Sequence, residues 1–371
     1  MMRYDIPEEE ARDYPMDGCS QVDIQGRSHM GLADSEVNLL KCLELTLNNG
    51  FNPLRGRQIT PKTGDNFQSF DDLISAYKKQ VEYATMRVCR AANIVQKAHA
   101  ETSPNLFRSL FIDDCTKKGI NVKAGGPRYN HGQILTQGIG NTADSLAAIK
   151  KLVFEEKRIS MTELMDAMKN DFPDEQFRQI LINGVPKYGN DDDYVDAFAR
   201  EIVDYFYTEL NKHQTWRGGI YGGGSIVFTR AASFGSNVGA TPDGRRARTI
   251  LADSVGPTRR QDKNGPTAMF KSVAKTPQAL AQSTHLLNVK FTPSMLRKSK
   301  EKVIALFKTY FAEGGQQIQV NVVDKETLWK AKSDPDGYRN LVVRVGGFSA
   351  YFTQLSHEHQ DCIIARTEQE M

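Results

Sequence analysis

The sequence predicts a mixed α/β fold, because short strand-like runs and longer amphipathic segments share one chain. The strand candidates are apolar, and each is followed by a helix or a loop. They cover residues 225–229, 285–291, 317–323 and 340–345. No internal repeat or low-complexity tract is present. The pattern therefore favours the α/β class.

The first helix is expected between about residues 35 and 50. Asp34 or Ser35 is its expected N-cap, and Gly50 supplies the stop. Its apolar face is formed by Leu39, Leu40, Leu43 and Leu47. The following residues 51–69 are rich in turn formers, so we expect a loop there.

A long amphipathic helix is expected from about Phe70 to Ala100, and Pro104 ends it. Further helices are expected near residues 142–156, 161–170 and 192–211. The run Asn190–Asp193 precedes the last of these and suits a helix N-terminus, both as a cap and as negative charge at the positive end of the dipole.

Residues 230–283 show little periodicity and are rich in Gly, Pro, Asp and Arg. A loop of this length in a compact domain is usually functional or disordered. Pro242-Asp243-Gly244 is by itself a type I turn signal. Arg245 and Arg246 after it could hold a phosphate, but a structural ion-pair loop is the favoured interpretation.

Charge and hydropathy argue against two classes of partner. The 371 residues include 48 Lys+Arg and 45 Asp+Glu without a block of like charge, which argues against nucleic acid or an anionic membrane. No apolar run approaches the roughly 18 residues of a membrane span, and Met1–Pro7 lack the apolar stretch of a signal peptide. We therefore expect a cytoplasmic protein of one or two domains.

Five scattered cysteines lack any C-x-x-C pair: Cys19, Cys42, Cys89, Cys115 and Cys362. Such a set is neither a disulfide framework nor a zinc ribbon, and it suits a reducing compartment. Cys42 and Cys89 fall in expected helices and are interpreted as packing residues. Cys19 lies instead in a polar, glycine-containing loop, so it is a candidate for chemistry.

Two adjacent glycines, Gly346 and Gly347, follow the β-branched run 342–345. A glycine in a strand-like segment usually marks a bulge or a close backbone approach. A chemical reason is also available, because a radical on a glycine Cα can become planar and delocalise into both flanking peptide groups. From the glycines alone, a strand-to-loop kink is the simpler interpretation.

The residues around this pair resemble a known family. Segment 344–352 (Arg-Val-Gly-Gly-Phe-Ser-Ala-Tyr-Phe), followed by 363–367 (Ile-Ile-Ala-Arg-Thr), resembles the radical-bearing segment of the glycyl radical enzymes, the pyruvate formate-lyase and glycerol dehydratase family. The loop segments 239–247, 265–268 and 272–275 resemble the same family. The resemblance implies that Gly347 stores the radical. Most members have a serine or a similar small residue where this chain has Gly346.

A second part of the resemblance lies around Cys19, which Gly26-Arg27 follows at the family's distance. It implies that Cys19 carries a transient thiyl radical and lies buried near Gly347. A sulfur radical is reactive enough to take hydrogen from a substrate C–H bond but too reactive to store. A glycyl radical can be stored in the absence of oxygen, so the two are expected a few ångströms apart in a dry cavity.

Two departures from the family pattern bear on the reaction. Family dehydratases carry a glutamate two residues after the cysteine as a general base, whereas this chain has Gln21, whose amide accepts no proton near neutral pH. We expect Gln21 to line the pocket and to orient substrate. Pyruvate formate-lyase itself has two adjacent cysteines, but Ser20 follows Cys19 here. Substrate and reaction type therefore stay open.

The resemblance runs from about Ile6 to Thr367, yet intact members carry a further large segment before the cysteine loop. Their fold is a ten-stranded α/β barrel of two antiparallel five-stranded halves. The resemblance implies that this chain is the second half of such a barrel, with barrel residues 1–300 and a glycyl radical domain over 301–371. A half-barrel exposes unpaired edges unless a partner fragment completes it. A split gene, a truncated gene model and an inactive remnant stay open.

The implied activity is that of a glycyl radical lyase that cleaves a C–C, C–O or C–X bond of a small organic substrate. No metal and no bound cofactor are expected. A separate S-adenosylmethionine/iron–sulfur activating enzyme would install the radical at Gly347, and intact members are homodimers. The alternative is a non-catalytic complementing or repair module that donates its glycyl radical domain, although such a module would not need the Cys19 loop.

Two further sets of side chains allow more than one interpretation. His357, His359 and Cys362 look like a metal cluster, but residues two apart on a helix diverge by about 200°, so the histidines cannot share a face. Arg344 is expected either to pair with a carboxylate or carbonyl near the glycine turn or to be a solvated charge, with equal weight.

Overall fold

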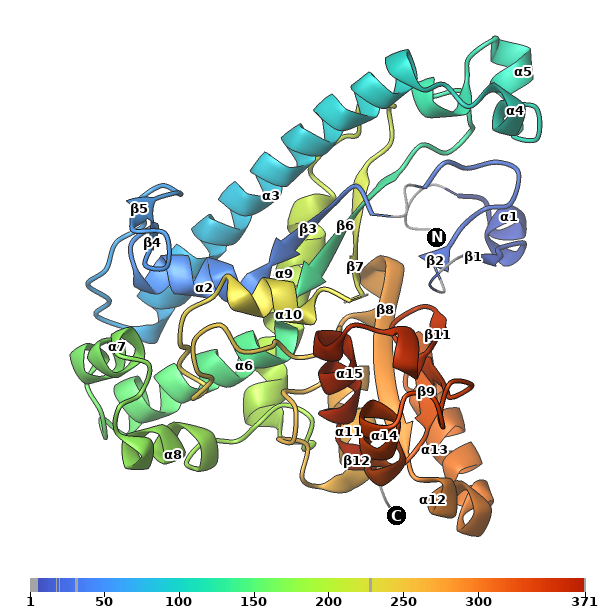
Figure 1. Ribbon diagram of the computed structural model, residues 1–371. Helices are drawn as coiled ribbons and strands as arrows, with labels where there is room; N and C mark the ends of the chain where they lie inside the picture. The colour runs from blue at the N-terminus through green and yellow to red at the C-terminus, as the bar shows by residue number, and fades with distance from the viewer. Residues whose placement is uncertain (1–5, 18, 20, 31–32, 227–228, 370–371) are drawn as a thin grey trace.

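A parallel sheet lies at the centre of the computed structural model, which describes residues 6–17, 19, 21–30, 33–226 and 229–369. Its strands pair in succession along the chain: β3 (Ser35–Asn38) with β6 (Gly132–Gln137), β6 with β7 (Tyr221–Ser225), β7 with β8 (Ala281–Phe291), and β8 with β9 (Gln317–Val322). The short strand β12 (Glu368–Gln369) also pairs parallel with β8. The expected mixed α/β class is confirmed (Figure 1).

Helices connect these strands, because parallel strands can be joined only by long crossovers. The main ones are α2 (Leu39–Leu47), α3 (Phe70–Thr102), α6 (Ile139–Ala148), which continues as a π-helix over Ile149–Glu155, and α9 (Asp193–Leu210). Helix α6 packs on α9 and α2 on α3, and α9 contacts β7. These four helices surround the ends of β3 and β6 (Figure 1).

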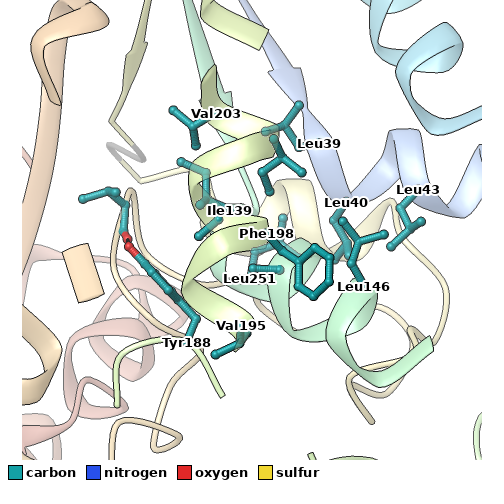
Figure 2. Close-up of a cluster of buried hydrophobic side chains, with 14 of the residues drawn as sticks. Leu39, Leu40, Leu43, Ile139, Leu146, Tyr188, Val195, Phe198, Val203 and Leu251 are labelled. Carbon is teal, nitrogen blue, oxygen red and sulfur yellow. Dashed lines mark hydrogen bonds between the residues drawn. The ribbon is translucent and has the colours of Figure 1, made fainter. Parts of the chain in front are cut away.

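The main core fills the space between these helices and the sheet. Figure 2 shows side chains of three helices pointing toward one another: Leu39, Leu40 and Leu43 from α2, Ile139 and Leu146 from α6, and Val195, Phe198 and Val203 from α9. Burying each such side chain fully is worth about 1.5–3 kcal/mol. The cluster therefore fixes one face of the sheet and leaves the other face available for a site.

The C-terminal residues form a second, smaller core beside β8 and β9 (Figure 1). It is built from Val323, Leu328, Ala331, Val343, Val345, Phe352, Ile363 and Ile364. Its elements are α14 (Lys325–Ser333), β10 (Val342–Arg344), β11 (Ser349–Tyr351) and α15 (His357–Ile364). Strands β10 and β11 pair antiparallel, so residues 345–348 form the turn between them.

The remaining elements are short or peripheral. The helices are α1 (Glu8–Arg12), α4 (Leu106–Ser109), α5 (Cys115–Lys118), α7 (Met161–Lys169), α8 (Glu175–Asn183), α10 (Ala231–Ser236), α11 (Gly265–Ala274), α12 (Pro293–Lys298) and α13 (Lys300–Ala312). Two hairpins are β1 (Met16–Asp17) with β2 (Gln21–Val22), and β4 (Phe51–Asn52) with β5 (Arg57–Gln58). Among the described residues, 3₁₀ turns cover Val122–Ala124, Gln278–Leu280 and Phe352–Gln354. None of the helices in the described ranges is long and apolar enough to cross a membrane.

The long helix and the helices expected near 142–156, 161–170 and 192–211 are confirmed. The predicted start of the first helix, near residue 35, was wrong. Residues 35–38 pair with β6, so α2 begins only at Leu39, and Asn38 is the cap, accepting from the N–H of Lys41 at 3.1 Å. A short strand that pairs with a distant partner has no local signal in the sequence.

Two more local expectations were wrong. The strand expected at 225–229 is β7 at Tyr221–Ser225, and residues 227 and 228 lie outside the described ranges. Its glycines allow close packing, since a Cβ on Gly223 would lie 1.9 Å from the ring of Tyr207. The stretch 230–283 is not all loop, because it contains α10 and α11.

Candidate active site

The two faces of the sheet carry different side chains, because alternate strand residues point to opposite faces. On β8, Leu287, Val289 and Phe291 belong to the main core, and on β9, Ile318 and Val320 pack against it. The residues between them face the other way. This second face, which we call the amide face, carries Gln133, Leu135 and Gln137 of β6, Leu286 and Asn288 of β8, and Gln317, Gln319 and Asn321 of β9.

Cys19 lies at the tip of the β1–β2 hairpin, between the paired residues Asp17 and Gln21. Its side chain is only 8% exposed and packs with Leu135, Leu286 and Ile226. The hairpin tip therefore rests on the amide face, away from the helices. The expected departure at Ser20 lies outside the described residues.

Gly347 lies directly against Cys19, although the two residues are near opposite ends of the chain. A Cβ built on Gly347 would lie 2.2 Å from Sγ and 2.3 Å from Cβ of Cys19. Gly347 also has a φ of +88°, in the left-handed region that favours glycine. Because both conditions hold at one position, glycine is the residue that allows this approach of backbone to sulfur.

Two amides of β9 hold the turn that carries Gly347. Oε1 of Gln319 accepts from the N–H of Gly347 at 3.1 Å and from Nε of Arg344 at 2.6 Å. Asn321 bonds both the N–H and the carbonyl of Arg344, each at 2.7 Å. Arg344 therefore pairs with a carbonyl beside the turn, which confirms the first of its two interpretations.

A buried ion pair ties down the start of the same turn. Nε of Arg366 donates to Asp253 at 2.8 Å, and its Nη atoms donate to the carbonyl of Arg344 at 2.9 Å and to that of Val345. Asp253 also accepts from Nδ2 of Asn288 at 2.9 Å. Asp253, from the 230–283 stretch, and Arg366, near the C-terminus, thus fasten the turn to the amide face.

Gln21 reaches the amide face beside the cysteine hairpin. It is 2% exposed, and its Nε2 donates to Oε1 of Gln133 on β6. An amide paired with an amide can donate and accept hydrogen bonds but supplies no general base. The arrangement at this position therefore offers hydrogen bonding without acid–base chemistry.

The other thiols are chemically quiet. Burial raises the pKa of Cys42 and of Cys89 to about 12, and both pack in the main core as the sequence predicted. Burial likewise raises the pKa of Cys115 and of Cys362. These side chains stay protonated near neutral pH and behave as small apolar groups.

The remaining sets that the sequence suggested have structural partners. His359 interacts with the Thr229 carbonyl and with Ser356, each at 2.8 Å. In the part of the chain that the structure describes, no group of three His, Cys, Asp or Glu is placed to hold a metal ion. Arg245 donates to the carbonyls of Gly239 and Thr249 within its own loop, as in a structural loop.

Sequence reasoning missed Gln133, Gln319 and Asp253. The run Gln317-Ile318-Gln319-Val320-Asn321 alternates amides and aliphatic residues, which is typical of a strand with one polar face. That signal could have marked the amide face. It could not show that the N–H of Gly347 lies on it, because that contact depends on where the C-terminal hairpin docks.

Comparison with known proteins agrees with this geometry. The chain matches the model of the pyruvate formate lyase-like family over residues 1–235 and the glycine radical model over residues 251–353. It is 38% identical to trans-4-hydroxy-L-proline dehydratase of Clostridioides difficile, over 97% of this chain and 46% of that protein. It is 33% identical to isethionate sulfite-lyase of Oleidesulfovibrio alaskensis, over 97% of this chain and 44% of that protein.

Solved structures give the same result. The glycerol-bound form of the B12-independent glycerol dehydratase from Clostridium butyricum matches with a TM-score of 0.96 and 39% identity, over 100% of this chain and 47% of that one. The chain thus spans about half the length of these relatives. The family model extends over more than half of the chain. The chain therefore belongs to the pyruvate formate lyase-like family of glycyl radical enzymes.

Proposed function

We propose that this chain acts in a glycyl radical lyase or dehydratase, in which Gly347 stores an unpaired electron and Cys19 transfers it to a small organic substrate. The contact between these two residues carries the proposal, since a Cβ on Gly347 would overlap the sulfur of Cys19. The similarity to dehydratases and to a sulfite-lyase supports the reaction class.

The proposed chemistry is a chain of hydrogen-atom transfers. The Gly347 Cα radical takes the hydrogen of the Cys19 S–H group, so that the S–H bond breaks, a Cα–H bond forms and the unpaired electron passes to sulfur. The thiyl radical then takes hydrogen from a substrate C–H bond, and the substrate radical breaks a neighbouring C–C, C–O or C–X bond. In C–O or C–X cleavage the leaving group takes the bonding electron pair, a hydroxyl leaves as water with the proton of the hydroxyl on the radical carbon, and the unpaired electron stays on the product; in C–C or C–X cleavage without such a proton, the leaving group itself carries the unpaired electron. The product radical recovers hydrogen from Cys19, which recovers it from Gly347, so no oxidant or reductant is consumed.

Unpaired polar atoms on the amide face support a substrate that carries hydroxyl or carbonyl groups. Within the described residues, buried side-chain atoms without a hydrogen-bond partner include Oε1 of Gln137, Oδ1 of Asn288 and Nε2 of Gln319. A buried polar atom left unpaired costs about 1–3 kcal/mol. We propose that Gln21 orients such a substrate and that the reaction does not use a carboxylate at this position.

We further propose that the chain is the second half of a ten-stranded barrel, with barrel residues 1–300 and a glycyl radical domain over 301–371. The succession of parallel strands supports the half-barrel, and the separate core that begins at Val323 supports a distinct C-terminal part. Val303, Leu306 and Tyr310 of the proposed second domain pack in the main core. The proposed partners are a polypeptide with the first half-barrel, a second copy of the completed enzyme, and a radical S-adenosylmethionine activating enzyme that modifies Gly347. We propose a cytoplasmic location.

Anaerobic activation followed by electron paramagnetic resonance tests the proposal. We expect a doublet that is absent in Gly347→Ala and retained in Cys19→Ala, whereas turnover of a panel containing glycerol, trans-4-hydroxy-L-proline and isethionate is lost in both. The panel is assayed with and without a polypeptide that supplies the first half-barrel. Turnover that survives Cys19→Ala would contradict the role of Cys19. If this chain instead restores turnover only to a damaged partner enzyme, and that turnover depends on the partner's own cysteine, the result would favour the repair module.

A further inference from the structure

Gln319 has a singular position relative to the glycine turn. It is 3% exposed, it projects from the amide face of β9, and its Oε1 accepts from the backbone N–H of Gly347 at 3.1 Å. In the described parts of the chain, the other side chains that anchor the turn, Asn321 and Arg366, bond the backbone of residues 344 and 345 only. Among the side chains that the structure describes, Gln319 is the one that bonds the backbone of the residue touching Cys19.

The orientation of this amide is fixed by its second partner. Nε of Arg344 lies 2.6 Å from the same oxygen, and a guanidinium donates hydrogen bonds but accepts none. The atom that meets both donors must therefore be the carbonyl oxygen rather than the NH₂ group. The bond from a charged donor is also stronger than a neutral one, so it holds the carbonyl in place for Gly347.

A fixed peptide N–H has a direct consequence for a radical on the adjacent Cα. The radical is planar and delocalised over the two flanking peptides, so the direction in which its unpaired electron points follows the orientation of the Gly347 peptide. Transfer between two reacting atoms depends steeply on their alignment, and a misplacement of 1 Å can cost about 100-fold in rate. The group that fixes the orientation of the Gly347 peptide therefore controls the rate at which the unpaired electron passes to Cys19.

We infer that Gln319 is a positioning residue for the radical transfer, and that its amide carbonyl orients Gly347 so that Cα faces the sulfur of Cys19. The inference rests on the proposed function. Gln319 takes no part in the bonds that change: hydrogen moves from Sγ of Cys19 to Cα of Gly347, and the unpaired electron moves the opposite way.

Three variants separate positioning from folding. Gln319→Met has a similar length but no acceptor for the N–H of Gly347. Gln319→Glu keeps an acceptor at that place and gives Arg344 a carboxylate. Gln282→Met is the matched control, because Gln282 is also buried, lies over Gly222 of β7, and has two polar side-chain atoms without a partner in the described residues.

The first readout is hydrogen exchange of the unactivated protein, followed by mass spectrometry of the peptide that contains residues 345–349. The Gly347 amide should exchange at least about tenfold faster in Gln319→Met, since its hydrogen bond is lost. It should exchange at the parental rate in Gln319→Glu and Gln282→Met. This arm needs no radical.

The second readout is the radical signal after anaerobic activation, followed in D₂O. The remaining α-hydrogen of Gly347 splits the signal into a doublet. The S–H of Cys19 exchanges with solvent, so transfer between the two residues replaces that hydrogen by deuterium and collapses the doublet. We expect Gln319→Met to form the doublet but to collapse it at least about tenfold more slowly, with Gln319→Glu and Gln282→Met near the parental rate.

The outcomes separate the two proposals. Parental exchange and collapse rates in a folded Gln319→Met protein overturn the role of Gln319 and leave the proposed function standing. A parent protein without a doublet overturns the proposed function, and the positioning role with it. Should Gln319→Met fail to fold, Gln319→Asn, which withdraws the carbonyl by one methylene, replaces it with the same expectations.

Discussion

Gly347 and Cys19 share one contact that no other residue type at position 347 would permit, since a side chain there would begin 2.2 Å from the sulfur. The contact joins a hairpin at the start of the chain to a turn near its end. Closing so long a loop costs conformational entropy. The Arg366–Asp253 pair and the bonds from Gln319 and Asn321 offset that cost by fixing the turn on the sheet.

The contact predicts how Gly347→Ala affects stability. Gly314 is the matched control, because its φ of +94° is similar and nothing lies within 4 Å of a built Cβ. We expect Gly314→Ala to lower the free energy of unfolding by about 1–2 kcal/mol, because alanine disfavours the left-handed backbone conformation. Gly347→Ala should cost more, because it must also displace Cys19. Urea unfolding of both variants measures the difference, and equal losses would argue against the close contact.

The buried ion pair predicts a large effect at Arg366. Arg366→Met leaves Asp253 buried and charged without its partner, so we expect a loss of about 3–5 kcal/mol and faster hydrogen exchange in the turn at 344–347. Adding Asp253→Asn should recover part of the stability, since the unpaired carboxylate at that position is then removed. Arg12, which forms an exposed pair with Glu8, is the control, and Arg12→Met should change little.

Both measurements on Arg366 use the unactivated protein. Chemical unfolding reports the free energy, and exchange of the peptide that spans the turn reports the local anchoring. If Arg366→Met destabilises the chain no more than Arg12→Met, or leaves exchange in the turn unchanged, the pair does not hold the turn.

Asp144 predicts a pH dependence of stability. It is fully buried in α6, and burial raises its pKa to about 7, against the lowering effects of Lys187 and of hydrogen bonds from Tyr188 and Thr258. The folded protein therefore binds this proton more tightly than the unfolded chain, whose aspartate has a pKa of about 3.9. This contribution to stability is fully present below pH 4 and is lost as pH rises to about 7.

At about 1.4 kcal/mol per pH unit, the Asp144 contribution amounts to at most about 4 kcal/mol. Asp144→Asn carries no titrating group, so the decline in unfolding free energy between pH 4 and 7 should become shallower by that amount. Urea unfolding at several pH values in parent and variant measures it. Parallel profiles would show that Asp144 does not titrate in this window.

Particular residues show how far the sequence determines the fold. Helices α3 and α9 carry apolar faces and capping residues in their own sequences, so they were predictable. Strand β3 was not, because its four residues become a strand only through pairing with β6. The glycine run of β7 was also missed, because each glycine is explained by a tertiary neighbour: a Cβ on Gly222 would meet Gln282, one on Gly223 the ring of Tyr207, and one on Gly224 Ser283.

The residues of the candidate site likewise divide into those that the sequence could predict and those that it could not. Gly347 and Cys19 were singled out by local residue patterns that resemble a family, and the structure brings them together. Gln319, Gln133 and Asp253 were not found, because each matters only through a contact with a distant segment. Amide residues in a strand carry no sign of which turn will dock on them, so their part in the site emerges from the tertiary structure.

Oxygen cleavage of the activated protein tests most directly whether the unpaired electron rests at position 347. A backbone radical reacts with oxygen and the chain breaks at that residue, so intact-mass measurement of the fragments locates the radical. Cleavage at Gly346 would give fragments that differ by one glycine residue. We predict cleavage at Gly347 in the parent and none in Gly347→Ala. An activated parent that stays intact in air, or that breaks at Gly346 or elsewhere, would contradict the account.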